Sequence, residues 1–148
     1  MPNPLIVSPD QSPLQLNVLG AQIKVLASAG QTGSYEIFRE TGPEGSGPPP
    51  HAHPWDEAFY VLNGEVLFGV DEQELAGGPG TLVHVPGGTF HWFRMGAGGA
   101  DMLSVTSKAG ASALFIDIDS KVSATEPDFD VLVGIAAERG LTLPLPAH

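Results

Sequence analysis

The chain has 148 residues, 42% of them hydrophobic, and its 17 acidic against six basic residues give a net charge of −11 at pH 7. A field of this sign repels the phosphate backbone of nucleic acids and an anionic membrane surface, so we expect neither as a partner. The length suits a single domain over residues 1–148, with enough apolar residues for one core.

The sequence contains no cysteine, which excludes disulfides and thiolate ligands. Any metal site must therefore be built from nitrogen and oxygen donors. The first residues lack the basic segment and apolar run of a signal peptide. No apolar stretch approaches the roughly 18 residues that a membrane span needs. We therefore expect a soluble, cytoplasmic protein.

The N-terminal third alternates between loops and short strands. Residues 1–13 contain four prolines and are expected to form a loose arm. Alternating apolar residues predict strands at 14–18, 23–27 and 34–39. The segment TGPEGSGPPP at 41–50 is typical of a loop that ends in an extended proline run.

The central segment has the clearest strand pattern, with Glu57, Phe59 and Val61 on one face. The following Asn63-Gly64 is a strong hairpin signal, so residues 65–70 are expected to return as the partner strand. A turn at 71–72 and loops rich in glycine and proline separate further strands, which are expected at 73–75, 81–85, 90–95, 102–107 and 113–118.

The period changes near the C-terminus, where apolar residues at 129, 132, 133 and 136 predict a helix within residues 125–140. Thr125, with Asp128 three residues on, is expected to cap it, with Pro127 in the first turn. Gly140 would end it. Many short strands with regular turns and one late helix favour a β-sandwich or barrel.

The residues that point to chemistry are histidines and a glutamate. His51 and His53 are two apart, so in an extended segment both side chains leave the same face. Glu57 begins the next strand, and His91 lies on a later strand that has Phe93 on the same face. If these faces line one interior, three imidazoles and a carboxylate converge. This donor set suits iron, manganese, nickel, cobalt, copper or zinc rather than calcium or magnesium.

These residues fall into two spaced motifs within residues 45–95 that resemble those of the cupin superfamily. The first motif is a glycine, five residues, His-x-His, a short spacer, a glutamate, six residues and a glycine. It is met by Gly45, His51, His53, Glu57 and Gly64. The second is a glycine, five residues, Pro-x-Gly, two residues, a histidine, three residues and an asparagine. It is met by Gly80, Pro86, Gly88 and His91, but Met95 stands at the final position.

Two further segments, PPPHAHPWDEAFYVLNGE and residues 138–141, resemble those of small single-domain cupins of the quercetin-dioxygenase-like group. The resemblance implies an all-β fold, a double-stranded β-helix or jelly-roll barrel, with a short C-terminal helix. It implies one divalent metal ion held by His51, His53, Glu57 and His91. The four glycines of the motifs would occupy turn positions.

The residues expected to line a substrate pocket beside this metal are Phe59, Val61, Phe93 and Met95. Plain barrel core is the alternative interpretation for these residues. Met95 in place of the usual asparagine would replace a polar contact with a soft apolar side chain. Glu57 is the expected catalytic base, a role that requires a pKa raised by an apolar pocket.

Three functions fit the resemblance. The first is a metal-dependent dioxygenase acting on a small, planar enol or phenol, such as a flavonol-like or diketone-like compound. The second is a metal-dependent isomerase or hydrolase of a hydroxy-carbonyl compound, and the third is a non-enzymatic small-ligand-binding cupin. His84 lies outside the motifs and is interpreted as structural or interfacial. We also expect a homodimer, formed through sheet edges and the N-terminal arm.

Overall fold

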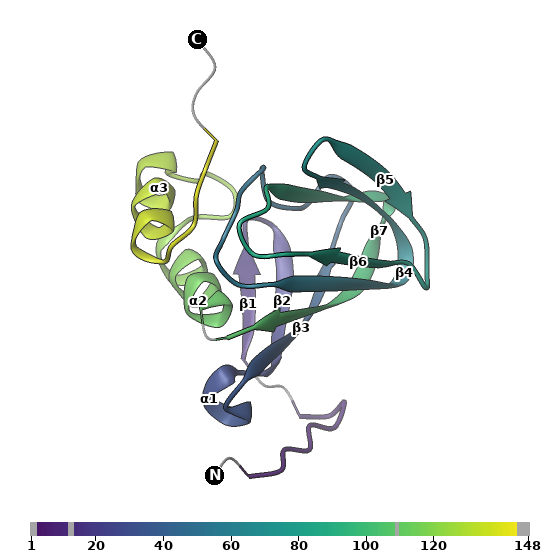
Figure 1. The fold of residues 1–148 in the computed structure, drawn as a ribbon, viewed down its shortest axis with the longest axis vertical. Helices are drawn as coiled ribbons and strands as arrows, with labels where there is room; N and C mark the ends of the chain where they lie inside the picture. The colour runs from purple at the N-terminus through teal and green to yellow at the C-terminus, as the bar shows by residue number, and fades with distance from the viewer. Residues whose placement is uncertain (1–2, 12–13, 109, 145–148) are drawn as a thin grey trace.

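Antiparallel strands curl into one barrel-like sheet in the computed structural model, which describes residues 3–11, 14–108 and 110–144 (Figure 1). The strands are β1 (Gln15–Val18), β2 (Ala21–Ala27), β3 (Tyr35–Gly42), β4 (Glu57–Val70), β5 (Gln73–Gly77), β6 (Leu82–Val85) and β7 (His91–Ser107). The helices are α1 (Ala29–Thr32), α2 (Ala111–Lys121) and α3 (Phe129–Glu138). The main path through the sheet runs β1-β2-β3-β7-β4-β5, and β6 pairs with β4. The predicted all-β framework is confirmed.

Strands β4 and β7 are long and bent, and each contributes to both halves of the barrel. Residues 57–61 of β4 pair with 102–106 of β7, whereas 66–70 pair with 91–95. The hairpin predicted at Asn63-Gly64 is therefore wrong, because residues 57–62 and 65–70 do not pair with each other. Gly64 has a φ of +77° and lies opposite Ala100 beside a shift in register. The Asn-Gly signal marks a β-bulge that bends a continuous strand.

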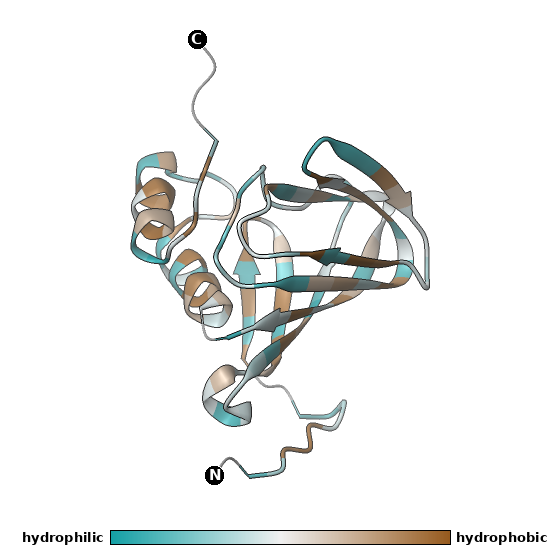
Figure 2. Cartoon of the chain, in the orientation of Figure 1, coloured by the Kyte–Doolittle hydropathy of each residue, from teal (hydrophilic) through white to brown (hydrophobic). Residues whose placement is uncertain are grey.

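The barrel encloses two hydrophobic clusters, because side chains alternate between its inside and outside along each strand. One cluster, which includes Phe59, Phe68 and Phe93, fills the half formed by β4, β6 and β7. The other lies between β1, β2 and the helices and includes Ile23 and Phe38. Figure 2 shows hydrophobic positions along the strands and on α2 and α3. The helices thus complete the second half of the core.

Helix α2 occupies a segment for which the sequence pattern predicted a strand at 113–118, and that prediction is wrong. The apolar run fits either structure by itself. Its buried residues, Ala111, Leu114, Asp117 and Ile118, recur at helical spacing. That spacing lets α2 cover the open side of the barrel next to β1 (Figure 1).

Helix α3 confirms the predicted C-terminal helix, with Gly140 just beyond its end at a φ of +79°. Its N-cap is Asp128, however, and not Thr125. The Asp128 side chain accepts hydrogen bonds from the backbone N–H groups of Asp130 and Val131. The helix therefore begins three residues later than predicted, after Pro127 instead of around it.

Residues 3–11 of the predicted N-terminal arm have no regular secondary structure and are mostly exposed. Residues 1–2 and 12–13 of the arm lie outside the described part of the chain, as does the C-terminal His148. None of the helices among the described residues is long and apolar enough to cross a membrane.

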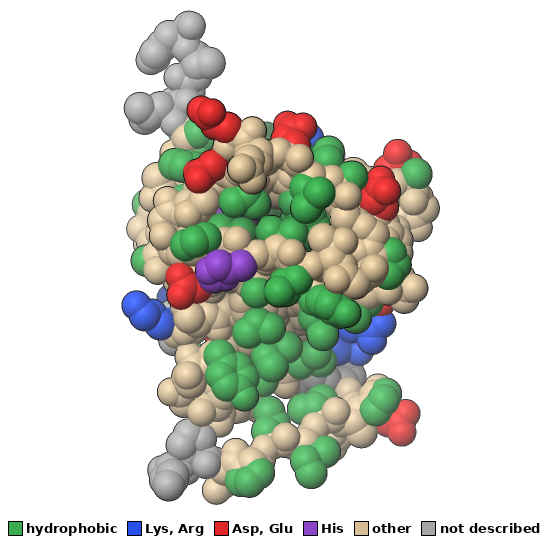
Figure 3. Space-filling view, turned by 45° about the vertical axis from the view of Figure 1, so that its right-hand side comes forward, with side chains coloured by type: hydrophobic (Ala, Val, Ile, Leu, Met, Phe, Trp, Pro, Cys, Tyr) green, Lys and Arg blue, Asp and Glu red, His purple; other side chains and the backbone are tan. Residues whose placement is uncertain are grey.

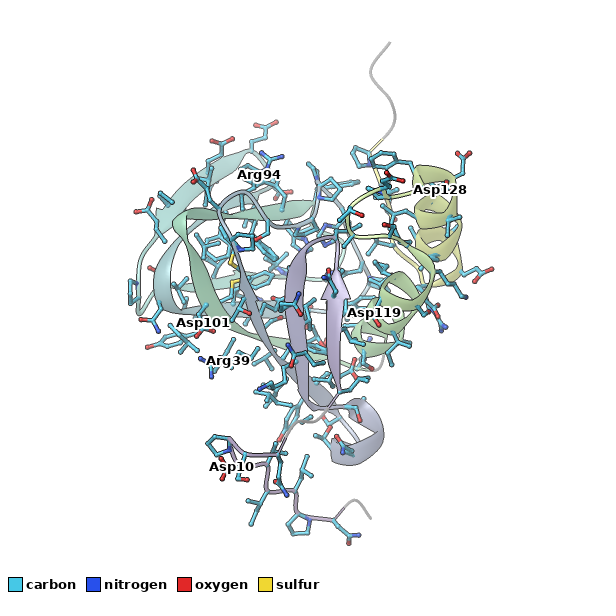
Figure 4. All side chains as sticks on the ribbon, turned by 180° about the vertical axis from the view of Figure 1, so that it is seen from behind. Asp10, Arg39, Arg94, Asp101, Asp119 and Asp128 are labelled. Carbon is cyan, nitrogen blue, oxygen red and sulfur yellow. The ribbon has the colours of Figure 1, made fainter. Side chains whose placement is uncertain are left out.

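The outer face of the sheet carries exposed apolar side chains, among them Tyr60, Leu82 and Val105. Figure 3 shows hydrophobic side chains gathered on this side of the molecule, next to a histidine. On β3 and β7, Arg39 donates from Nε to Asp101 at 2.9 Å, and both side chains point outward (Figure 4). This ion pair thus lies on the outside of the barrel. The homodimer stays a prediction.

Candidate metal centre

His51 and His91 are brought together by the backbone. Each donates its N–H to the carbonyl oxygen of the other, at 3.0 and 2.9 Å, which forms an isolated antiparallel bridge. Their ring centroids lie 4.3 Å apart. His53 continues the same extended segment, and its carbonyl oxygen accepts from Gly88 N at 2.8 Å. The loop that carries two of the histidines is thereby fastened to the strand that carries the third.

Each of the three imidazoles is oriented by a backbone carbonyl two residues away. The Nδ1 atoms of His51, His53 and His91 lie 2.8, 2.9 and 2.9 Å from the carbonyl oxygens of Pro49, Trp55 and Thr89 respectively. A carbonyl only accepts hydrogen bonds, so Nδ1 carries the proton in each ring. This leaves the Nε2 lone pairs free, the arrangement usual for metal-ligating histidines.

The free nitrogens of His51, His53 and His91 converge, because one ligand atom from each lies within 4.8 Å of the others. His91 Nε2 is fully buried and makes no hydrogen bond with any described residue. Burial, and then the neighbouring His91, lowers the pKa of His51 to about 4. His51 is therefore neutral at pH 7, which is the form that binds metals.

Glu57 faces two of these nitrogens. Its Oε1 atom lies 3.2 Å from His53 Nε2 and 3.4 Å from His91 Nε2. With Nδ1 protonated, these contacts bring acceptors together, and such a contact is favourable only with a proton or a metal ion between the atoms. The four predicted ligands thus fit a divalent ion. Whether they bind one stays a prediction.

The second carboxylate oxygen of Glu57 accepts from Ser104 Oγ at 2.7 Å. Burial by itself raises the pKa of Glu57, but when His53 and His91 carry a proton on Nε2, their proton donation and positive charge outweigh burial and lower the pKa to about 2. The pKa of Glu57 is thus lowered by its histidine neighbours, whereas a catalytic base would need it raised. The role of Glu57 as the catalytic base stays a prediction.

Trp55 packs against the histidine cluster through the His53 ring. Its ring stacks on His53 with a centroid distance of 4.3 Å and an interplanar angle of 11°. The indole is buried in the core between the barrel and α2, where it packs close to Gly110. Trp55 is therefore a packing residue that fixes the plane of the His53 ring.

An apolar cavity leads to the cluster. It has about 750 Å³ of empty space when the solvent at its open mouth is counted. His51, Glu57, Phe59 and Phe93 line its inner part. Its outer walls come from β1, β2, the loop at 47–49, helices α2 and α3, and residues 141 and 143.

Two of the four predicted pocket residues, Phe59 and Phe93, line this cavity, but Val61 and Met95 do not. Val61 and Met95 have 0% and 1% of their surface exposed and belong to the packed core cluster. The alternation of each strand carries them past the two phenylalanine rings, which lie 5.6 Å apart, and deeper into the far half of the barrel. Their alternative interpretation as plain barrel core is the one that the structure supports.

The cavity also contains a carboxyl that the sequence reasoning missed, that of Glu40 on β3. Ser104 was missed as well. For Glu40 a signal was present, because the alternation of β3 places Glu36 and Glu40 on the same face as the buried Phe38. Acidic residues on a core-facing pattern are uncommon enough to mark a site. His84 is exposed on β6 and does not line this cavity, in agreement with its structural or interfacial interpretation.

Comparison with known proteins finds a matching family model and a relative with a known activity. The family model described as the cupin domain matches residues 38–106. Quercetin 2,3-dioxygenase from Bacillus subtilis strain 168 is 32% identical over 82 residues, which are 55% of this chain and 24% of that protein. The match thus spans about a quarter of the length of that relative.

Solved structures share the fold. A structure described as an RmlC-like cupin from Shewanella frigidimarina gives a TM-score of 0.66 over 75% of this chain and 96% of its own, at 18% identity. A predicted oxalate decarboxylase from Thermotoga maritima gives a TM-score of 0.61 over 70% of this chain and 97% of its own, at 21% identity. Likeness at these identities concerns the fold alone, and it confirms the predicted jelly-roll barrel.

Proposed function

This chain is a small cupin, and from that premise we propose that it is a metal-dependent dioxygenase acting on a small, planar, mostly apolar substrate with an enol or phenol oxygen. The observation that carries the proposal is the convergence of ligand nitrogens from three histidines beside an apolar cavity, which His51 and Glu57 line. Such a cavity with a few convergent polar groups is the usual form of a small-molecule site.

The proposed ligands are His51, His53, His91 and Glu57. Three neutral imidazoles and one carboxylate contribute a single negative charge, and the carbonyl contacts of Nδ1 hold the rings in the ligating tautomer. A divalent transition metal bound there would supply a net positive charge for an enolate or phenolate oxygen and, if redox-active, electron exchange with dioxygen.

The residues around the cluster would position the substrate. The rings of Phe59 and Phe93 present apolar surface next to Glu57 and suit the face of a planar ring. The apolar walls exclude water, which strengthens every polar contact inside. Glu57 would present a carboxylate oxygen that accepts a hydrogen bond from a substrate hydroxyl, and its role as the base that takes the proton stays a prediction.

The sequence likeness supports the reaction class. The relative that matches at 32% identity is a quercetin 2,3-dioxygenase, and we transfer dioxygen chemistry from it as a proposal only. The structural neighbours include an RmlC-like cupin and a predicted oxalate decarboxylase, and a shared fold does not choose among reactions.

The test begins with the metal content of the purified full-length protein, measured by elemental analysis beside two variants. We expect about one equivalent of a divalent transition metal in the wild type, because its four donors complete a single site. H53A should lose this metal. H84A, which removes an exposed histidine of β6, is the matched control and should keep it.

The second step measures oxygen uptake with flavonols and 1,3-diketones on protein loaded with iron, manganese, nickel or cobalt. The proposal expects uptake stoichiometric with substrate for at least one compound, abolished in H53A and retained in H84A. No uptake across the panel would refute it. Full activity of the zinc form on hydroxy-carbonyl compounds would instead support an isomerase or hydrolase. Absence of metal even after reconstitution would favour a non-enzymatic binding protein.

A further inference from the structure

The wall of the cavity includes a buried acid that the proposed function leaves unused. Glu40 has 3% of its surface exposed and lines the same cavity as His51 and Glu57. Its Oε2 atom has no hydrogen-bond partner among the described residues. A buried polar atom without a partner destabilises the fold, so its presence at the wall of a cavity points to a ligand.

Glu36 lies on the same face of β3 and is also buried, but both of its carboxylate oxygens accept hydrogen bonds. One of its oxygens accepts from Ser112 N at 3.0 Å, and the other accepts from Ala29 N at 3.1 Å and from Ser112 Oγ at 2.5 Å. Glu36 thereby ties α1 and α2 to the sheet. Glu40 has no comparable role in joining elements.

No described residue of the cavity wall places a lysine or arginine beside Glu40. The neighbouring Arg39 points to the other face of the sheet and pairs with Asp101 (Figure 4). No lysine or arginine occurs among the described residues that line the cavity. Burial, and then the negative charge of Glu57, raises the pKa of Glu40 well above its usual range. The neutral acid, which can donate a hydrogen bond, is therefore favoured.

Glu40 and Glu57 enter the cavity from separate positions on the barrel wall. Glu40 lies opposite Met102 of β7, and Glu57 lies opposite Thr106 of the same strand. Four residues of strand separate these positions, which is about 13 Å at the usual rise per residue. The two side chains therefore reach the cavity from different parts of its wall.

We propose that Glu40 forms a second polar subsite, at which its carboxyl group hydrogen-bonds an uncharged carbonyl or hydroxyl oxygen of the substrate. The inference rests on the proposed function only in using the same cavity. It narrows the substrate class to neutral, mostly apolar molecules with two separated oxygen functions. Dicarboxylates and sugar phosphates are disfavoured, because a second anionic group would face a buried acid with no cation beside it.

The test is equilibrium binding of three probes that share one ring system: 2-naphthol, naphthalene and 2-naphthoate. The titrations use full-length protein freed of metal by a chelator, because a metal ion would itself attract the naphthoate. The variants are E40M, which removes the polar atoms, and E40Q, which keeps a donor. T106V is the matched control, since Thr106 Oγ1 is another buried atom without a described partner and does not line this cavity.

Loss of one hydrogen bond should weaken 2-naphthol binding to E40M by about 5- to 10-fold. Naphthalene affinity should change by less than about 2-fold, because apolar burial is preserved. E40Q and T106V should stay within about 3-fold of the wild type for 2-naphthol. The wild type should bind 2-naphthoate more weakly than 2-naphthol.

Equal affinity of the wild type and E40M for 2-naphthol would overturn the subsite, as would tighter binding of 2-naphthoate or no saturable 2-naphthol binding. These readouts involve neither metal nor oxygen. A protein that binds 2-naphthol through Glu40 yet consumes no oxygen would refute the proposed reaction and leave the subsite standing.

Discussion

Replacing Glu40 should make the protein more stable, even though the residue is buried. Its Oε2 atom is desolvated and has no described partner, and the surrounding charge is that of another carboxylate, Glu57. Methionine has a similar volume and no polar atom that needs a hydrogen bond. E40M should therefore remove the free-energy penalty of a buried carboxyl group that has no hydrogen-bond partner.

The size of the effect follows from the penalty for a buried unsatisfied polar group, about 1–3 kcal/mol. We expect E40M to raise the free energy of unfolding by about 1–2 kcal/mol, after allowing for imperfect packing of the new side chain. For a chain of this length the corresponding rise in melting temperature is about 2–8 °C.

The pH dependence of the free energy of unfolding separates the effect of the Glu40 charge from the other effects of this side chain on stability. The pKa of Glu40 is raised above its usual value of 4.5 in the folded state, so the folded protein binds more protons than the unfolded chain above that pH. The contribution of Glu40 is fully present below about pH 4.5 and is lost as the pH rises towards the folded pKa. E40Q does not titrate, so its advantage over the wild type should grow between pH 5 and pH 8.

The assay is urea unfolding of the wild type, E40Q and E40M at pH 5 and pH 8, with metal removed from all samples. The other ionisable groups that line the cavity, His51 and Glu57, are present in every protein, so most of their effect cancels in the differences. A destabilised E40M, or an E40Q advantage that is the same at both pH values, would refute the reasoning.

Three further substitutions test other parts of the structure. S104A removes the 2.7 Å hydrogen bond to Glu57 and should weaken metal binding by about 10-fold in competition with a chromophoric chelator; unchanged affinity would show that the bond does not orient the ligand. D128A deletes the N-cap of α3 and should cost about 1 kcal/mol in urea unfolding, and a null effect would contradict the capping geometry. G64A places a Cβ 2.3 Å from a backbone oxygen of β7 at a positive φ, and should cost about 2–3 kcal/mol. G45A, at a similar φ in open space, is its control and should cost clearly less.

The residues of the histidine cluster could be predicted because short-range spacing decides their directions. His51 and His53 share a face by being two apart in an extended segment, and the alternation from Glu57 to Val61 carries the glutamate to the inside. All four glycines of the two motifs, Gly45, Gly64, Gly80 and Gly88, have positive φ, as expected of turn and bulge positions. Such features depend on a few neighbouring residues and survive changes elsewhere in the chain.

The wrong predictions share a dependence on distant partners. Asn63-Gly64 would suit a tight hairpin, but pairing of both flanking segments with β7 makes it a bulge in one strand. The apolar run at 113–118 suits a strand or a helix, and the open side of the barrel next to β1 selects the helix. Neither choice can be made from a local window, because the deciding surface is formed by residues far away in the sequence.

The same distinction between local and distant determinants applies to the proposed metal ligands and the residues of the cavity wall. Met95 in place of the usual asparagine was expected to remove a polar contact from the pocket. Met95 instead packs in the core cluster with Val61 and Met102, where a polar side chain would not face the cavity. Glu40, a polar residue of the cavity wall that lies outside the motifs, is on a strand that precedes both of them. Most of the other walls come from β1, β2, α2 and α3. The proposed metal ligands all lie in the two motifs, whereas most of the cavity wall lies outside them, so we expect substitutions outside the motifs to change the substrate without removing the metal site.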